Sequence, residues 1–216
     1  MLNKQVELIR DQFMKQYKHS YVPEQLYEQV LTYSQIDFFK KLFSKFNSKT
    51  HDVLFESLLH MQASLDIHDQ VDLTFKEDSK GRNFSNQLQV LVGDYHSSYF
   101  YNLLSQHNLL DELYHFIQAI KKINECKMSV LHNDKALSLE ELIKQVEYIH
   151  TGLFDATNDI CKVDHYEEQL KPRLIKQLVY SKDNFWLSIL KEQFSQEFKR
   201  VFDARINYWE LYHFIN

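Results

Sequence analysis

The stretch LHMQASLDIHDQVDL, residues 59–73, predicts a helix that ends in a group of acidic residues. Clustered carboxylate oxygens are the ligands that Mg²⁺ prefers in proteins. Two helix residues that are four positions apart lie on one face. Within the last five residues of this stretch, Asp69 and Leu73 are such a pair. Leu73 has no metal-binding atom, and Gln70 between them is a neutral ligand. The stretch therefore has the layout of an acidic metal site with its ligands depleted.

The composition around this stretch favours long helices. The 216 residues include 3 Gly and 2 Pro, far below ordinary usage, so few turns can interrupt the chain. Hydrophobic residues make up 44%, which is enough for a core, and the alternation typical of strands is absent. We predict an all-α bundle forming a single domain over 1–216, with N-terminal helices in 1–49, a core in 50–160 and C-terminal helices in 161–216.

Apolar periodicity and capping residues locate the helices. The first is predicted from about Lys4 to Tyr17, and Pro23 suits the first turn of a second helix. Thr50 is a candidate cap for the helix that runs to about Leu73. Further helices are predicted over about 85–106 and 110–130, after a polar loop at 76–83, and from Ser138, where Ser138 and Glu141 have capping-box spacing.

Charge and cysteine content exclude several classes of protein. The formal net charge is −5 and no basic run dominates, which argues against nucleic-acid binding. Cys126 and Cys161 lie far apart, which fits a reduced, cytoplasmic setting. No apolar run is long enough to span a membrane.

The second informative segment, residues 84–104, is apolar or small on two faces. Gly93 lies inside it, at a cost of about 1 kcal/mol relative to alanine, with Ser97 one turn later. This pattern indicates a helix that another helix approaches closely. From the pattern alone, that neighbour is either another helix of the bundle or a second subunit.

Together these two segments resemble the small subunit, component 1, of bacterial heptaprenyl diphosphate synthase. The resemblance rests on QVLVGDY, residues 89–95, and on ASLDIHD, residues 63–69. It covers about residues 50–160. It implies a fold related to the isoprenoid synthases and a heterodimer with a large catalytic subunit, component 2, that carries Mg²⁺. Such a complex extends farnesyl diphosphate with isopentenyl diphosphate to the side chain of menaquinone. So apolar a product implies contact of the complex with the membrane surface.

The chain departs from the active trans-prenyl synthases that it resembles. Their first motif has two adjacent aspartates, where this chain has Asp69 and Gln70, with Asp72 following. An arginine pair should come next, and the chain offers Lys80 and Arg82 around Gly81. No two aspartates are adjacent anywhere in the sequence, so a second motif is missing. We therefore expect no catalytic, cofactor or metal residue on this chain.

The remnants of the motif have several interpretations. Asp69 and Asp72 are either solvated residues at a helix end, lining of a vestigial cleft, or part of a working metal site. Asp66 is a candidate paired residue at an interface, and His68 with Asp72 could share a cation. Asp66 and His68 are also candidate remnants of the cleft, together with Asp69 and Asp72. Asp94 lies in the helix that is expected to be buried on two sides, so it should have a hydrogen-bonding partner.

The interface with component 2 is expected on the helix over 85–106. Partner side chains, together with this helix, would line the channel that holds the growing prenyl chain, where each buried CH₂ contributes about 0.8 kcal/mol. The expected contact residues are Leu88, Gly93, Asp94, Ser97, Phe100 and Leu104.

Three other functions remain open from the residues. The pairs His51-Asp52 and His68-Asp69 suit a stand-alone His-Asp metal-dependent phosphohydrolase. A helical adaptor unrelated to isoprenoids fits the composition equally well. An active homodimeric prenyl transferase would need the acidic motifs that the chain lacks.

Overall fold

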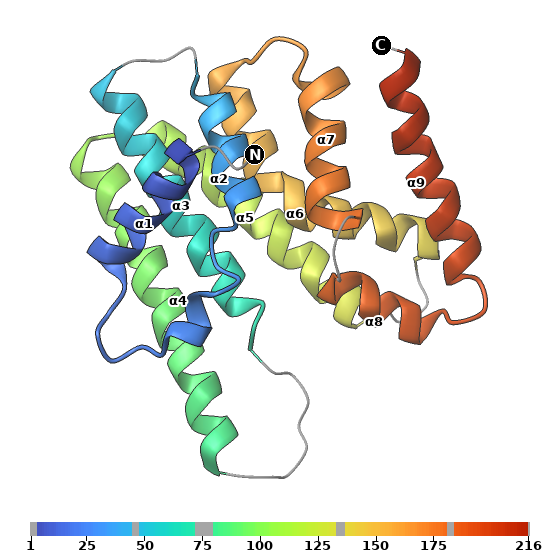
Figure 1. The fold of residues 1–216 in the computed structure, drawn as a ribbon, viewed down its shortest axis with the longest axis horizontal. Coiled ribbons are helices and arrows are strands. Elements are labelled where there is room, and N and C mark those ends of the chain that lie inside the picture. The colour runs from blue at the N-terminus through green and yellow to red at the C-terminus, as the bar shows by residue number, and fades with distance from the viewer. Residues whose placement is uncertain (1–3, 45–47, 72–79, 133–136, 181–183, 216) are drawn as a thin grey trace. The chain divides into compact units, whose positions relative to one another are not determined.

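The computed structural model describes residues 4–44, 48–71, 80–132, 137–180 and 184–215, with the backbone alone for 80–85 and 210–215. Every regular element in these ranges is a helix, which confirms the all-α prediction (Figure 1). The chain forms two compact units, unit 1 (Met1–Leu113) and unit 2 (Tyr114–Asn216). Each unit is described by itself, and the single-domain organisation and the relation to the isoprenoid synthase fold stay predictions.

Unit 1 is built around a pair of long helices that pack side by side, α3 and α4. Fully buried aromatic and aliphatic side chains from α2, α3 and α4 fill its core, among them Phe38, Phe39, Leu58 and Phe100. The elements of the unit in chain order are α1 (Lys4–Tyr17), the 3₁₀ turn η1 (Glu24–Tyr27), α2 (Tyr33–Leu42), α3 (Lys49–His68), α4 (Lys80–Gln106) and the start of α5 (Leu110–Leu131).

The helix predicted from Pro23 is wrong, because the chain makes only a 3₁₀ turn there and helix α2 begins ten residues later, at Tyr33. Thr32 sets that start through a capping box in which its hydroxyl accepts from the Gln35 amide and its own N–H donates to the Gln35 side chain, 2.6 Å away. Tyr33, the first residue of α2, is 40% exposed.

The bounds of α3 also differ from those predicted. Ser48, not Thr50, caps the helix by accepting from the His51 amide. The helix ends at His68 rather than at about Leu73, and Asp69 follows it as the C-cap. Because α3 stops there, Asp69 and Gln70 lie beyond the helix, and the later positions of the stretch, 72 and 73, are outside the described residues.

Unit 2 continues along α5 and adds α6, which carries the capping box predicted at Ser138 and Glu141. Its core joins apolar residues of α5, α6, α8 and the π-helical turn η3, including Ile143, Val146, Val179 and Leu190. The elements after α5 are α6 (Leu139–Cys161), the π-helical turn η2 (Tyr166–Leu170), α7 (Lys171–Ile175), η3 (Lys176–Tyr180), α8 (Phe185–Gln193) and α9 (Phe198–Ile215).

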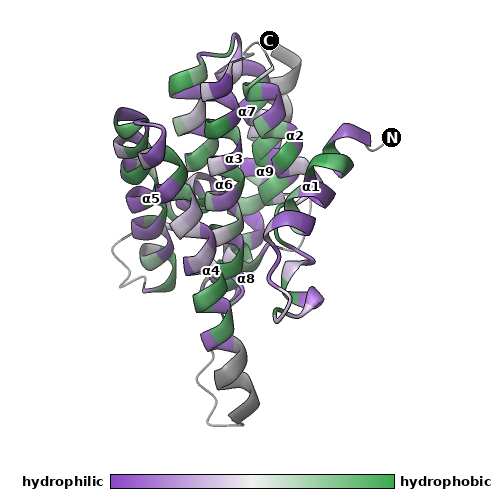
Figure 2. Ribbon diagram, turned by 90° about the vertical axis from the view of Figure 1, so that its left-hand side faces the viewer, coloured by the Kyte–Doolittle hydropathy of each residue, from purple (hydrophilic) through white to green (hydrophobic). Residues whose placement is uncertain are grey.

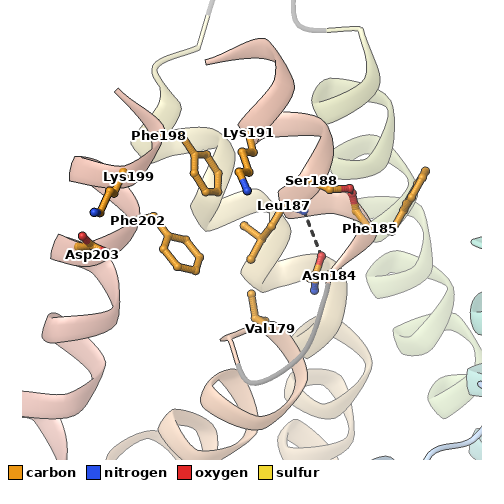
Figure 3. Close-up of a pocket in the computed structure, with 10 residues that line it drawn as sticks. All are labelled: Val179, Asn184, Phe185, Leu187, Ser188, Lys191, Phe198, Lys199, Phe202 and Asp203. Atoms are coloured by element: carbon orange, nitrogen blue, oxygen red, sulfur yellow. Dashed lines mark hydrogen bonds between the residues drawn. The ribbon is translucent and has the colours of Figure 1, made fainter. Parts of the chain in front are cut away.

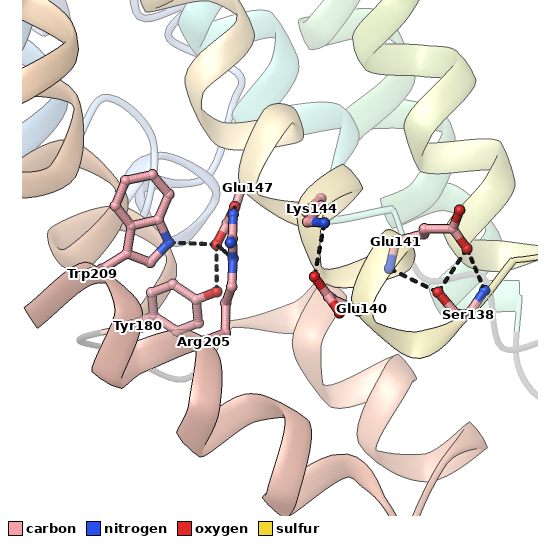
Figure 4. A network of polar contacts seen from close by, with 8 residues as sticks. All are labelled: Ser138, Glu140, Glu141, Lys144, Glu147, Tyr180, Arg205 and Trp209. Atoms are coloured by element: carbon pink, nitrogen blue, oxygen red, sulfur yellow. Dashed lines mark hydrogen bonds and ion pairs between the residues drawn. The ribbon is translucent and has the colours of Figure 1, made fainter. Parts of the chain in front are cut away.

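A buried carboxylate fastens α9 to the rest of unit 2 (Figure 4). Glu147 of α6 is 5% exposed and accepts two hydrogen bonds from the Arg205 guanidinium, at 2.8 and 2.6 Å. The Tyr180 hydroxyl and the Trp209 indole N–H each donate to the same carboxylate at 2.7 Å. Bidentate pairing and extra donors are what a buried carboxylate requires.

Figure 2 shows polar and apolar residues interspersed along the helices rather than one continuous apolar helix. In the part of the chain that the structure describes, no helix is long and apolar enough to cross a membrane.

Candidate functional site at the end of α3 and the middle of α4

The two sequence segments singled out above meet where α3 ends against the middle of α4. Gly93 of α4 is buried, and a Cβ atom at this position would lie 2.6 Å from two ring atoms of His68. The absence of a side chain at Gly93 therefore lets the imidazole lie directly against the α4 backbone. The close approach inferred from Gly93 is made by a helix of the same unit.

His68 also pairs with the residue that follows this glycine. Its Nε2 lies 3.5 Å from Asp94 Oδ1, and the two side chains are 35% and 65% exposed. An ion pair with this exposure contributes little to stability. It does orient the ring, because His68 is held against Gly93 on one side and toward Asp94 on the other.

Asp66 has a structural role inside unit 1. Its Oδ2 accepts from the Leu31 amide at 2.9 Å, and its Oδ1 accepts from the Gln35 and Gln62 side chains at 2.9 and 2.8 Å. Burial raises the pKa of Asp66 to about 7, although these three donors act in the opposite direction. Asp66 is thus paired with residues of its own unit, and its expected place at an interface stays a prediction.

The backbone that Asp66 holds is in an unusual conformation. Leu31 is fully buried with φ of +50°, a region that is costly for a residue with a side chain. Arg10 of α1 holds the same segment from its carbonyl side, donating to Leu31 O at 3.0 Å and Tyr27 O at 2.8 Å. Asp66 and Arg10 together fix the connection between η1 and α2.

The remaining motif positions do not assemble a described metal site. Asp69 is the C-cap of α3, and the Gln70 side chain donates to Asp66 O at 3.2 Å. Asp72 and Leu73 lie outside the described residues, as do the side chains of Lys80 and Arg82. Within the described ranges no group of three or more His, Cys, Asp or Glu side chains could hold a metal ion. The donor-filled Asp66 carboxylate does not fit Mg²⁺, because the cation would compete with its three N–H partners.

The predicted interface residues of α4 fall into two sets. Gly93, Phe100 and Leu104 are buried within unit 1, and Phe100 and Leu104 are fully so. Asp94 is exposed, and Leu88 and Ser97 are half-buried. The contact of this helix with a second subunit stays a prediction. If it forms on this conformation, it has to use the exposed face opposite Phe100.

A buried histidine pair lies about two turns before His68 on α3 and one turn after Gly93 on α4, and the sequence pattern does not indicate it. His60 of α3 and His96 of α4 are fully buried with their Nδ1 atoms 3.0 Å apart. His96 Nε2 lies 3.2 Å from the Tyr27 hydroxyl, whereas His60 Nε2 has no hydrogen-bond partner. The His60 ring stacks on Tyr99 at 4.7 Å between centroids.

Burial keeps both histidines neutral. It lowers the pKa of His60 to about 3, with His96 adding to the shift, and that of His96 to about 4. Such a pair can share only one proton between the facing Nδ1 atoms. Its 36-residue separation leaves no local pattern in the sequence, so only the fold identifies it.

The histidine pair predicts a loss of stability in acid. Both folded pKa values lie below the ordinary value of about 6.5, so the unfolded chain binds more protons below that pH. This stabilisation is fully present above about pH 6.5 and is lost as the pH falls toward 4. We expect wild-type protein to lose about 2 kcal/mol more than His60→Phe between about pH 7 and pH 5.

Urea unfolding at both pH values measures this difference. Asp66, whose pKa is raised, acts in the opposite direction but is present in both proteins, so it cancels in the comparison. Equal pH dependence of the two proteins would show that the His60 ring does not titrate as the burial requires.

Comparison with known proteins identifies the family to which the chain is similar. The family model described as heptaprenyl diphosphate synthase (HEPPP synthase) subunit 1 matches residues 19–210. The chain belongs to this family. A curated relative, heptaprenyl diphosphate synthase component 1 of Geobacillus stearothermophilus, is 33% identical over 97 residues, which are 45% of this chain and 41% of the relative. The match thus spans less than half of the relative's length. No solved structure matches the chain.

Membership of the subunit 1 family weighs against the alternative functions. The two His-Asp pairs of the phosphohydrolase hypothesis lie at opposite ends of α3, since His51 is in its first turn and His68 is its last residue. At 1.5 Å per residue the two histidines are about 25 Å apart along the helix. They cannot share a metal centre. An adaptor unrelated to isoprenoids does not agree with the family match.

Proposed function

We propose that this chain is the non-catalytic subunit of a heterodimeric long-chain prenyl diphosphate synthase. It binds a larger catalytic subunit, corresponding to component 2, that carries the Mg²⁺ sites. The pair extends farnesyl diphosphate with isopentenyl diphosphate, and the product supplies the side chain of menaquinone. The coarser statement, membership of the subunit 1 family, is shown by the family match.

The observation that carries the non-catalytic role is the use of Asp66. A diphosphate-binding Mg²⁺ needs carboxylate oxygens that are open to the ion. The carboxylate of Asp66 instead accepts three hydrogen bonds from its own chain. Gln70 stands where prenyl synthases have an aspartate, and its amide bonds to the α3 backbone. These contacts support a scaffold role for this end of α3.

The exposed face of α4 supports docking of the catalytic subunit. Leu91 and Tyr101 are 65% and 42% exposed. At about 100° per residue, Leu91 lies on the side of the helix opposite the buried Phe100, and Tyr101 lies on a flank of the same exposed face. Asp94 and Ser98 lie between them and are also exposed. Large apolar side chains exposed on one helix face mark candidate interaction surfaces.

Docking on this face predicts that Leu91→Asp and Tyr101→Asp disrupt the complex. A charged residue desolvated at an interface weakens binding by roughly 2 kcal/mol or more, about 30-fold. Both residues are exposed, so the isolated variants should keep the wild-type thermal midpoint. Co-purification with the candidate component 2 and the dissociation constant measure the effect.

The matched control is Leu8→Asp, because Leu8 of α1 is 55% exposed and lies in the same unit. It should bind component 2 as the wild type does. Product formation is then measured for each subunit alone and for the pair. Polyprenyl product from the purified chain with Mg²⁺ and substrates alone would contradict the non-catalytic role. Unchanged binding by both α4 variants would contradict this docking face.

A further inference from the structure

An open groove lies between α8 and α9 of unit 2, far along the chain from the α3–α4 site (Figure 3). Its volume is about 700 Å³, within the range of 300–1,000 Å³ that is typical of small-molecule sites. The proposed docking face on α4 makes no use of it. The groove therefore has to be explained separately.

The walls of the groove are apolar and partly rigid. Val179 and Leu187 belong to the buried core of the unit and form its base and one side (Figure 3). Phe198 and Phe202 of α9 line the opposite side with their rings stacked, 5.2 Å between centroids and 21° apart. Phe185 stands at the edge and is 46% exposed. A surface of this kind favours a flexible hydrocarbon over a polar ligand.

The polar groups at the groove differ in how far they are already engaged. Asn184 accepts from the Leu187 amide and lies 2.8 Å from His150. Lys199 has Asp203 one helical turn away on α9. Figure 3 shows the Lys191 ammonium group extending toward the space between α8 and α9. Among the described residues, neither Lys191 nor Lys199 forms an ion pair, but the Lys199 ammonium group points away from the groove in Figure 3. Lys191 is therefore the cation that faces a ligand in the groove.

We propose that this groove binds a single apolar chain with an anionic head group. The hydrocarbon lies along Phe198 and Phe202, and the phosphate or carboxylate of the head pairs with Lys191. Prenyl phosphates and fatty-acid anions share this chemistry. The site does not depend on the proposed subunit role, because unit 2 alone forms all of its walls.

Calorimetric titration of the purified chain with dodecyl phosphate below its micelle concentration tests the site. One equivalent should bind, and decyl phosphate should bind about 15-fold more weakly, because each methylene strengthens binding about fourfold. Lys191→Gln should weaken dodecyl phosphate binding about tenfold. The control is Lys121→Gln, whose side chain on α5 is 69% exposed and does not line the groove.

A groove-filling variant, Ser188→Trp, should abolish binding while the thermal midpoint stays within a few degrees of wild type. Ser188 lines the groove from the exposed side of α8. Farnesyl phosphate and laurate then distinguish the sources of the ligand, and saturable binding of either supports the site. Absence of binding by all three amphiphiles, binding unchanged in Ser188→Trp and Lys191→Gln, or binding only to vesicles of phosphatidylglycerol would overturn it.

Discussion

Replacement of Glu147 by alanine is expected to destabilise unit 2 by about 3–5 kcal/mol, the largest effect of any single substitution considered for this chain. The substitution leaves the Arg205 guanidinium, which is 16% exposed, without its carboxylate. It also removes the acceptor of the Tyr180 hydroxyl and the Trp209 indole. Three donors from two elements lose their partner at once, so α9 should detach before the rest of the unit unfolds.

Urea unfolding followed by tryptophan fluorescence measures this effect, because Trp209 lies in the network itself. Glu140→Ala is the matched control on the same helix. Glu140 pairs with Lys144 at 2.8 Å, but both side chains are at least half exposed (Figure 4), so its loss should cost under about 1 kcal/mol. Glu147→Gln should fall between the two, since it keeps one acceptor oxygen. Similar stabilities for Glu147→Ala and Glu140→Ala would contradict the fastening role.

Asp66→Ala is expected to have the second-largest effect, a loss of about 2–4 kcal/mol at pH 5. It leaves the Leu31 amide and the side chains of Gln35 and Gln62 without an acceptor. Asp37→Ala is the control, because Asp37 forms only a partly exposed pair with Lys41 on α2. Chemical unfolding of unit 1 measures both variants.

The size of the Asp66 effect should depend on pH in a defined direction. The folded pKa of about 7 lies above the ordinary value of about 3.9, so between these values the folded chain binds more protons than the unfolded chain. The stabilisation from Asp66 is complete below about pH 4 and is lost as the pH rises through 7. The Asp66→Ala penalty should therefore be smaller at pH 8 than at pH 5. A penalty that grows with pH would show that the three donors outweigh burial.

Local signals in the sequence predicted much of the fold. The bounds of α1 and the capping box at Ser138 agree with the structure because apolar periodicity and short-range capping determine them. The segment after Pro23 was misassigned for a long-range reason. The backbone of this segment depends on the positive φ of Leu31 and on hydrogen bonds with Arg10 and Asp66. No local sequence signal predicts these long-range contacts.

The sequence singled out the two segments that meet at this site but not the contacts that join them. The sequence indicated that α3 ends in acidic residues and that Gly93 is closely approached, and the structure brings His68 against that glycine. Reading Asp66 as a remnant of a cleft missed its three donors, because Leu31 and Gln35 lie more than 30 residues away. The partners of Glu147 on α9, 58 and 62 residues distant, were hidden for the same reason.

The hydrogen bonds that Arg10 donates to the carbonyls of Tyr27 and Leu31 limit how far the N-terminus of this protein can be trimmed in a designed fragment. The family model begins at residue 19, and a fragment trimmed to that match would lack α1. Such a fragment would lack Arg10, which donates to the backbone before α2. It would also lack Phe13, whose ring packs 4.8 Å from that of the buried His60. Helix α1 is thus part of the packed structure of unit 1, and the protein used in assays of subunit pairing should include it.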